Sequence, residues 1–136
     1  MSIKLLAAGA ALLPVCAAAL PDGWIAAGGL GGDVSFYVNS SKTISIAPVE
    51  TGDLTIEQMG EEMREFYGDL GFSCANYRLS SSLVSFDCTR SDDRNAEMPR
   101  KVSIYLLKKD NRITAASLIG GASYEDLKLI MGSNSL

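Results

Sequence analysis

The stretch FSCANYRLSSSLVSFDC, residues 72–88, consists of two runs of strand-forming residues on either side of three serines. Serine is common in turns because its hydroxyl bonds the nearby backbone, so Ser80–Ser82 mark the point where the chain reverses. Together with the residues that follow, the stretch predicts two antiparallel strands, 72–78 and 83–90, joined as a hairpin.

The register of this hairpin brings two cysteines together. If Leu79 pairs with Leu83 across the loop, Cys74 lies directly opposite Cys88. Opposed Cα atoms in antiparallel strands lie about 4.5–5.5 Å apart, which is within range of a disulfide bond. A zinc site, a catalytic thiol or a redox motif fits less well, because the chain has no histidine and no C-x-x-C pair. We therefore predict a structural disulfide between Cys74 and Cys88.

A helix is predicted just before the hairpin, over TIEQMGEEMREFYGDL, residues 55–70. Thr55 and Gln58 match a capping box, and Gly71 is placed to end the helix in a left-handed conformation. The apolar residues recur at helical spacing and form one stripe: Ile56, Met59, Met63, Phe66, Tyr67 and Leu70. We expect this stripe to lie across a sheet, with the acidic side of the helix facing solvent.

Alternating apolar and polar residues predict four further strands, and a second capping box predicts a short helix near the C-terminus. The strands span 33–39, 43–49, 101–108 and 112–119, and the helix spans 124–131. The order β-β-α-β-β-β-β-α, with about six strands, predicts an α+β fold in which the long helix covers one face of an antiparallel sheet. Pro48 cannot donate to a ladder, so it marks either an edge strand or the end of the second strand.

The N-terminal residues MSIKLLAAGAALLPVCAAAL are typical of a secretory signal peptide, with cleavage expected near Ala19. The apolar run is shorter than the about 20 residues of a spanning helix, and the residue before Cys16 suits lipid modification poorly. We expect a signal peptide (1–19), a Gly-rich flexible lead-in (20–32) and a single α+β domain (33–136). The mature chain would have no transmembrane segment and would act in the periplasm or as a secreted protein.

Composition excludes several classes of function. The mature chain would carry 11 basic and 16 acidic residues, a net charge of −5 that disfavours nucleic-acid binding. Without histidine a Ser-His-Asp triad is impossible, and we expect no catalytic activity, no cofactor and no metal. Residues 50–69 carry seven acids and one base, whereas residues 90–112 carry seven bases and four acids. This asymmetry indicates either two differently solvated faces or an electrostatically selective partner surface.

The polar loop 91–100 is the predicted recognition surface, because loops on a rigid scaffold commonly carry binding residues. The candidate partner-binding residues are the charged side chains in and beside it: Arg90, Asp92, Asp93, Arg94, Glu97 and Arg100. The leading hypothesis is a small exported protein-binding module, such as an inhibitor, an immunity protein or an accessory subunit, whose partner is another protein.

Two other functions remain open. A structural or assembly protein of the cell envelope would associate through an unpaired sheet edge. A carboxylate-dependent envelope enzyme would use pairs on the long helix, such as Glu61 with Glu65 or Glu62 with Asp69. Such pairs are also typical of a solvated helix face, which makes the enzyme the third hypothesis.

Overall fold

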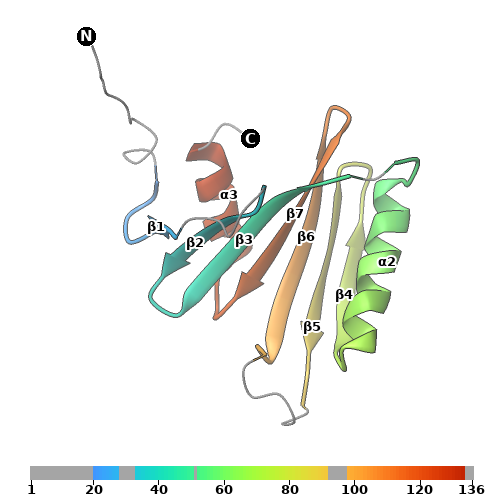
Figure 1. Ribbon diagram of the computed structural model, residues 1–136, viewed down its shortest axis with the longest axis horizontal. Coiled ribbons are helices and arrows are strands. Elements are labelled where there is room, and N and C mark those ends of the chain that lie inside the picture. The colour runs from blue at the N-terminus through green and yellow to red at the C-terminus, as the bar shows by residue number, and fades with distance from the viewer. Residues whose placement is uncertain (1–19, 28–32, 51, 92–97, 134–136) are drawn as a thin grey trace.

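The computed structural model describes residues 20–27, 33–50, 52–91 and 98–133 (Figure 1). These residues form an antiparallel sheet of seven strands and two helices, which confirms the predicted α+β class. The order across the sheet is β1-β2-β3-β7-β6-β5-β4. The elements are β1 (Ile25–Ala26), β2 (Ser35–Asn39), β3 (Lys42–Val49), α2 (Ile56–Asp69), β4 (Ser73–Leu79), β5 (Leu83–Thr89), β6 (Lys101–Lys109), β7 (Arg112–Ile119) and α3 (Tyr124–Ser133).

The prediction of about six strands was wrong by one, because a short seventh strand, β1, lies within the segment 20–32. Ile25 pairs with Val38 of β2, and Ala26 pairs with Tyr37. Trp24, directly before β1, is only 7% exposed and packs in a hydrophobic core. Burial of this large aromatic side chain anchors β1 to the rest of the sheet. The sequence does not predict β1, because two residues in a glycine-rich segment are too few to show a strand pattern.

Both ends of α2 are as the sequence predicts. Thr55 Oγ1 accepts from the N–H of Gln58 at 3.1 Å, and the Gln58 side chain accepts from the N–H of Thr55 at 2.9 Å. Gly71 has a φ of +96°, and beyond it the N–H of Phe72 donates to the carbonyl of Tyr67 at 3.0 Å. These bonds satisfy backbone groups that a helix end otherwise leaves without partners.

The two helices lie on opposite faces of the sheet and at opposite ends of it (Figure 1). In β6, Ile104 belongs to the core with α2, whereas its neighbour Tyr105 packs against the core with α3. Because successive strand residues point to opposite faces, α2 covers β4 to β6 on one side and α3 covers β3 and β7 on the other. The predicted arrangement, with one covered face, is corrected accordingly. We call the two sides the α2 face and the α3 face.

The packing stripe of α2 differs in part from the predicted one. Ile56 and Met59 are buried as expected, but Phe66 is 58% exposed. Gly60 is buried in its place, and a Cβ added there would lie 2.7 Å from Cγ1 of Val84. The helix therefore approaches β5 closely at a glycine that an apolar pattern does not single out.

The predicted disulfide is confirmed: Cys74 and Cys88 are opposite each other and bonded, with Cα atoms 4.0 Å apart. The predicted register near the loop is wrong, because Leu79 pairs with Val84 rather than with the residue before it. A β-bulge restores the expected pairing at the cysteines, and Asn76 within it has a φ of +59°. Asparagine is one of the few residues that tolerate this left-handed conformation.

Of the two positions predicted from Pro48, the edge strand is wrong and the end of the strand is confirmed, because Pro48 is the next-to-last residue of β3. Strand β3 lies between β2 and β7, and Pro48 is paired with Thr114 of β7. On its other side β3 pairs with β2 only from Lys42 to Ile46. Proline is tolerated because the described residues place no strand beside that side of Pro48.

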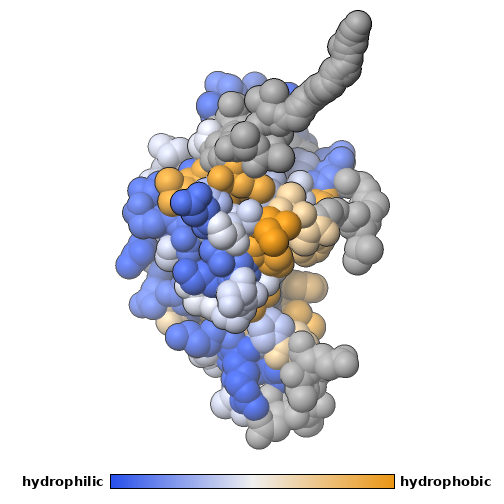
Figure 2. Space-filling model, turned by 90° about the vertical axis from the view of Figure 1, so that its left-hand side faces the viewer, coloured by the Kyte–Doolittle hydropathy of each residue, from blue (hydrophilic) through white to orange (hydrophobic). Residues whose placement is uncertain are grey.

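A part of the α2 face is not covered by either helix. Strands β2 and β3 contribute uncharged side chains to it: Phe36, Val38, Thr43, Ser45 and Ala47. Figure 2 views the molecule from the β1 side and shows hydrophobic surface gathered between hydrophilic regions.

Neither α2 nor α3 is long and apolar enough to span a membrane.

Candidate functional site

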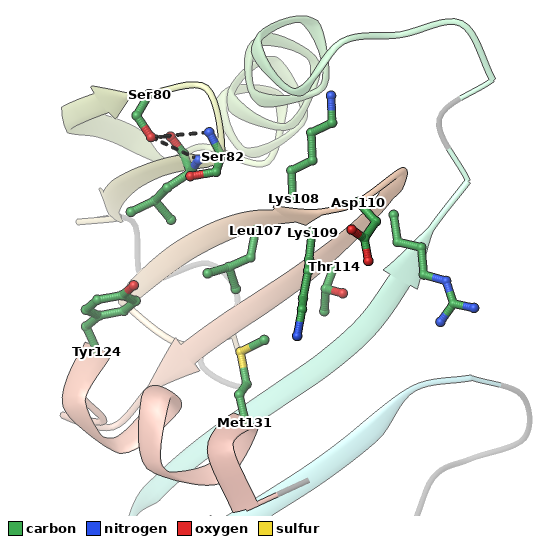
Figure 3. Close-up of a pocket in the computed structure, with 11 residues that line it drawn as sticks. Ser80, Ser82, Leu107, Lys108, Lys109, Asp110, Thr114, Tyr124 and Met131 are labelled. Atoms are coloured by element: carbon green, nitrogen blue, oxygen red, sulfur yellow. Dashed lines mark hydrogen bonds between the residues drawn. The ribbon is translucent and has the colours of Figure 1, made fainter. Parts of the chain in front are cut away.

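A surface groove of about 700 Å³ lies on the α3 face, between α3 and the loop that joins β4 to β5 (Figure 3). We call it the α3 groove. Its apolar lining comes from two strands and the helix: Leu83, Leu107, Tyr124 and Met131. Its volume falls within the range of about 300–1,000 Å³ that is usual for ligand sites.

The helix wall of the groove is fixed at its first turn. Ser123 and Asp126 form a reciprocal capping box, with bonds of 2.9 and 3.1 Å. The ring of Tyr124 stacks on Tyr105 of β6, with ring centroids 4.8 Å apart. Leu127 and Ile130 are fully buried against the sheet. These contacts hold Tyr124 and the rest of α3 at a set distance from β6.

The opposite wall is the loop at Ser80–Ser82. The hydroxyl of Ser80 accepts from the N–H of Leu83 at 3.1 Å and from the N–H of Ser82 at 3.4 Å. The N–H of Lys108 in β6 donates to the carbonyl of Ser82 at 2.8 Å. The loop is therefore tied both to itself and to the neighbouring hairpin, so the groove has two ordered walls.

One end of the groove is charged: Lys109 and Arg112 outnumber the Asp110 carboxylate, so the net charge there is positive. Lys109 and Arg112 are paired at the tip of the β6–β7 hairpin, where Asp110 takes a φ of +57° in the turn. Alternation along the strand places Lys109 on the α3 face and Lys108 on the other face. Figure 3 shows these two side chains pointing in opposite directions, with Lys109 extending toward Met131.

A second hollow lies beside the α3 groove. It has a volume of about 580 Å³, shares Arg112 and Thr114 with the groove, and reaches Tyr37 and Pro48 on β2 and β3. An extended chain segment laid across Arg112 and Thr114 would contact both hollows, whereas a compact small molecule would fill one.

A polar network lies further along the same face. Asp87 of β5 accepts from Asn76 Nδ2 at 3.0 Å and from Ser103 Oγ at 2.8 Å. Burial, and then the Asp87 carboxylate, raise the pKa of Tyr105, whereas Arg78 lowers it. Because both carboxylate oxygens have donors, this network orders the strand surface beside the groove.

The predicted partner-binding residues of the loop 91–100 differ in their exposure to solvent. Arg90 is 6% exposed, donates to the carbonyl of Met98 at 2.9 Å and lies over the ring of Phe72. Its side chain closes the base of the loop and presents little surface to a partner. Arg100 is exposed. Four other predicted contact residues lie outside the described residues: Asp92, Asp93, Arg94 and Glu97.

The carboxylates proposed for an enzyme all lie on the outer side of α2. All four carboxylates named above are exposed: Glu61, Glu62, Glu65 and Asp69. Glu61 bonds Arg64 at 3.1 Å. Within the described ranges, the acidic and cysteine side chains do not gather into a group suited to a metal ion.

Sequence reasoning did not single out the groove residues. Lys109 and Arg112 contribute to the basic region 90–112, and Tyr124 to a predicted helix, but no pattern marks any of the three as a site residue. The basic bias of residues 90–112 was the one available signal. The sequence does not give the position of α3. Because α3 lies beside Lys109 and Arg112, these two side chains form one end of a groove.

Comparisons of this chain with protein-family models, with curated proteins and with solved structures find no match.

Proposed function

We propose that this protein is a small exported protein-binding module without catalytic activity of its own, and that its α3 groove holds a segment of the partner. The observation that carries the proposal is the groove itself, with an apolar lining and a cationic end on a rigid sheet. The signal-like N-terminus and the Cys74–Cys88 bond support export, because disulfides persist in oxidising compartments.

The groove's chemistry defines the segment that it would take. Leu107, Tyr124 and Met131 favour apolar side chains, and methionine adapts to irregular shapes. Lys109 and Arg112 favour a carboxylate near the hairpin tip, and arginine can bind it through two parallel hydrogen bonds. The partner segment is therefore extended, apolar over part of its length and acidic at one end.

Charge reversal in the groove tests this proposal. The double variant Lys109→Glu/Arg112→Glu replaces two attractive charges by repulsive ones, and we expect it to lose at least tenfold in partner capture, equivalent to about 1.4 kcal/mol. Capture from envelope and culture-medium fractions by the tagged, exported protein would be quantified by mass spectrometry. Lys101→Glu, at the far end of β6, is the matched control and should capture as well as wild type.

The loop 91–100 is tested in the same assay. Arg94→Glu/Arg100→Glu should weaken capture if the loop contacts the partner, and should leave the fold intact by circular dichroism. Loss of capture in this variant, with the groove variant unchanged, would move the site from the groove to the loop. Equal capture by all variants would contradict both surfaces.

The structural or assembly role remains the alternative. Strand β4 is at one end of the sheet order, and its outer edge has no partner strand among the described residues. An exposed edge can accept a further strand through backbone hydrogen bonds. A large insoluble assembly in the envelope fraction, in place of a stoichiometric complex, would favour this role.

A further inference from the structure

Helix α2 carries an outward surface with the chemistry that the α3 groove accepts. Phe66 is 58% exposed and Leu70 is 41% exposed, although both are large apolar side chains one turn apart. Glu62 and Asp69 lie on the same side of the helix as Phe66, and Glu65 is adjacent. We call these five residues the α2 ridge. It presents apolar side chains surrounded by carboxylates.

The groove is the complement of this ridge. Leu107 and Met131 match an inserted aromatic ring. Lys109 and Arg112 outnumber the Asp110 carboxylate between them, so this end of the groove attracts the ridge carboxylates. In the ridge itself no base offsets the acids, and the nearby Arg64 is bonded to Glu61 and lies over the Tyr77 ring at 4.7 Å. Opposite charges are therefore presented by two distinct surfaces of one chain.

We propose that the α3 groove of one copy binds the α2 ridge of a second copy of this chain. The proposal rests on the proposed function, because it uses the same groove as a protein-binding site. Within one molecule the contact is impossible, since ridge and groove lie on opposite faces of the sheet. Self-association then competes with capture of the foreign partner.

The position of the two surfaces also fixes the kind of assembly. A pair of copies cannot exchange ridge and groove reciprocally, because the two surfaces of each copy point away from each other. The contact is heterologous, so copies add head to tail, in an open chain or, where the rotation between copies closes, in a ring. Electrostatic attraction between exposed groups makes the association weak and sensitive to salt.

Sedimentation of the purified exported protein tests the inference. Between about 10 µM and about 1 mM, the mean mass of wild type should rise continuously, without a plateau at the dimer. Raising salt from about 0.05 M to about 0.5 M should return it to monomer, because the Debye length shortens severalfold. A wild type that is monomeric over the whole range, or forms a closed dimer, would overturn the inference.

Charge-swapped variants identify the surfaces. Lys109→Glu/Arg112→Glu makes the groove acidic, and Glu62→Lys/Glu65→Lys makes the ridge basic, so each variant alone should remain monomeric. Mixed in equal amounts they should associate again, since each surface then meets one of opposite charge. The control Lys101→Glu/Asp22→Lys changes charge outside both surfaces and should behave as wild type. Association by either swapped variant alone, or none in the mixture, would contradict the assignment.

The two proposals can fail separately. If the protein does not self-associate but partner capture depends on Lys109 and Arg112, the proposed function stands and this inference falls. If wild type associates through ridge and groove but no partner is captured, the self-contact stands without the proposed function. Circular dichroism of each variant confirms that the fold is retained in either case.

Discussion

Asn76 lets the β4–β5 hairpin form the disulfide at Cys74 and also pack Tyr77 in the core with α2. The bulge at this residue places both Cys74 and Tyr77 on the α2 face, although they are an odd number of positions apart. Without the extra residue, strand alternation would send one of them to the other face. The Asn76 side chain meanwhile bonds Asp87 on the α3 face. A single left-handed residue thus serves the disulfide, the core and the polar network.

Tyr105 gives the protein an alkaline pH dependence. Burial, followed by the Asp87 carboxylate, raises its pKa above the ordinary value of about 10. The folded state therefore holds the phenol proton more tightly than the unfolded state does. The associated stability is complete below about pH 10 and is lost as pH rises through the folded-state pKa.

We expect the free energy of unfolding to fall above about pH 10, and to fall less steeply in Tyr105→Phe, since this variant has no phenol proton to lose. Urea denaturation from pH 8 to pH 11 measures both slopes. Part of the dependence should persist in the variant, because burial also raises the pKa of Tyr77. Identical slopes in the variant and wild type would contradict the role of Tyr105.

At the scale of elements, the position of α2 depends on a glycine at its contact with the sheet. A Cβ at Gly60 would lie 2.7 Å from Val84 Cγ1 and 2.9 Å from the Tyr77 hydroxyl. Any larger residue must displace the helix or the side chains of Val84 and Tyr77. Further along the same helix, Gly68 has no atom within 4 Å of the corresponding Cβ position. The two glycines therefore share a helix and differ in what surrounds them.

This pair forms a matched test. Gly60→Ala should lower the free energy of unfolding by about 1–3 kcal/mol, because overpacking outweighs the gain in helix propensity. Gly68→Ala should raise it by about 0.5 kcal/mol, since alanine restricts the unfolded chain and meets no obstacle. Chemical denaturation monitored by circular dichroism measures both. Equal effects in the two variants would show that α2 does not contact β5 closely.

The whole molecule is built on one sheet with a hydrophobic core on each face. One core contains Phe86 and Ile104 with α2, and the other contains Ile44 and Leu118 with α3. Strands β6 and β7 contribute side chains to both. Loss of either core removes support from strands that the other needs, so we expect a single cooperative unfolding transition.

Trp24 tests this coupling, because it is the single tryptophan and packs in the core with α3. Its fluorescence should change at the same denaturant concentration as the circular dichroism of the whole sheet. Trp24→Ala should lower the free energy of unfolding by about 3–5 kcal/mol. The neighbouring Ile25→Ala, at a side chain that is 65% exposed, should stay within about 0.5 kcal/mol of wild type. Two separate transitions would show that the cores unfold independently.

Sequence by itself determined the features that depend on near neighbours. The caps of α2, the alternation of the long strands and the β4–β5 hairpin all follow from residues close together in the chain. Local hydrogen bonds and backbone preferences decide these features. The α+β class could therefore be predicted correctly. The disulfide was predicted as well, but from a Leu79–Leu83 pairing that is wrong, and the cysteines are opposite each other only because of the bulge at Asn76.

Only the tertiary structure decided where these elements meet. β1 exists because Trp24 packs against residues of β3, β7 and α3, and a two-residue strand has too little pattern to be predicted. The α3 groove exists because α3 lies on the face opposite α2, where Tyr124 stacks on Tyr105. An amphipathic helix must bury its apolar side, but its own sequence does not specify which face of a sheet will cover it. That choice depends on the combined packing of distant segments, and it assembles the candidate site.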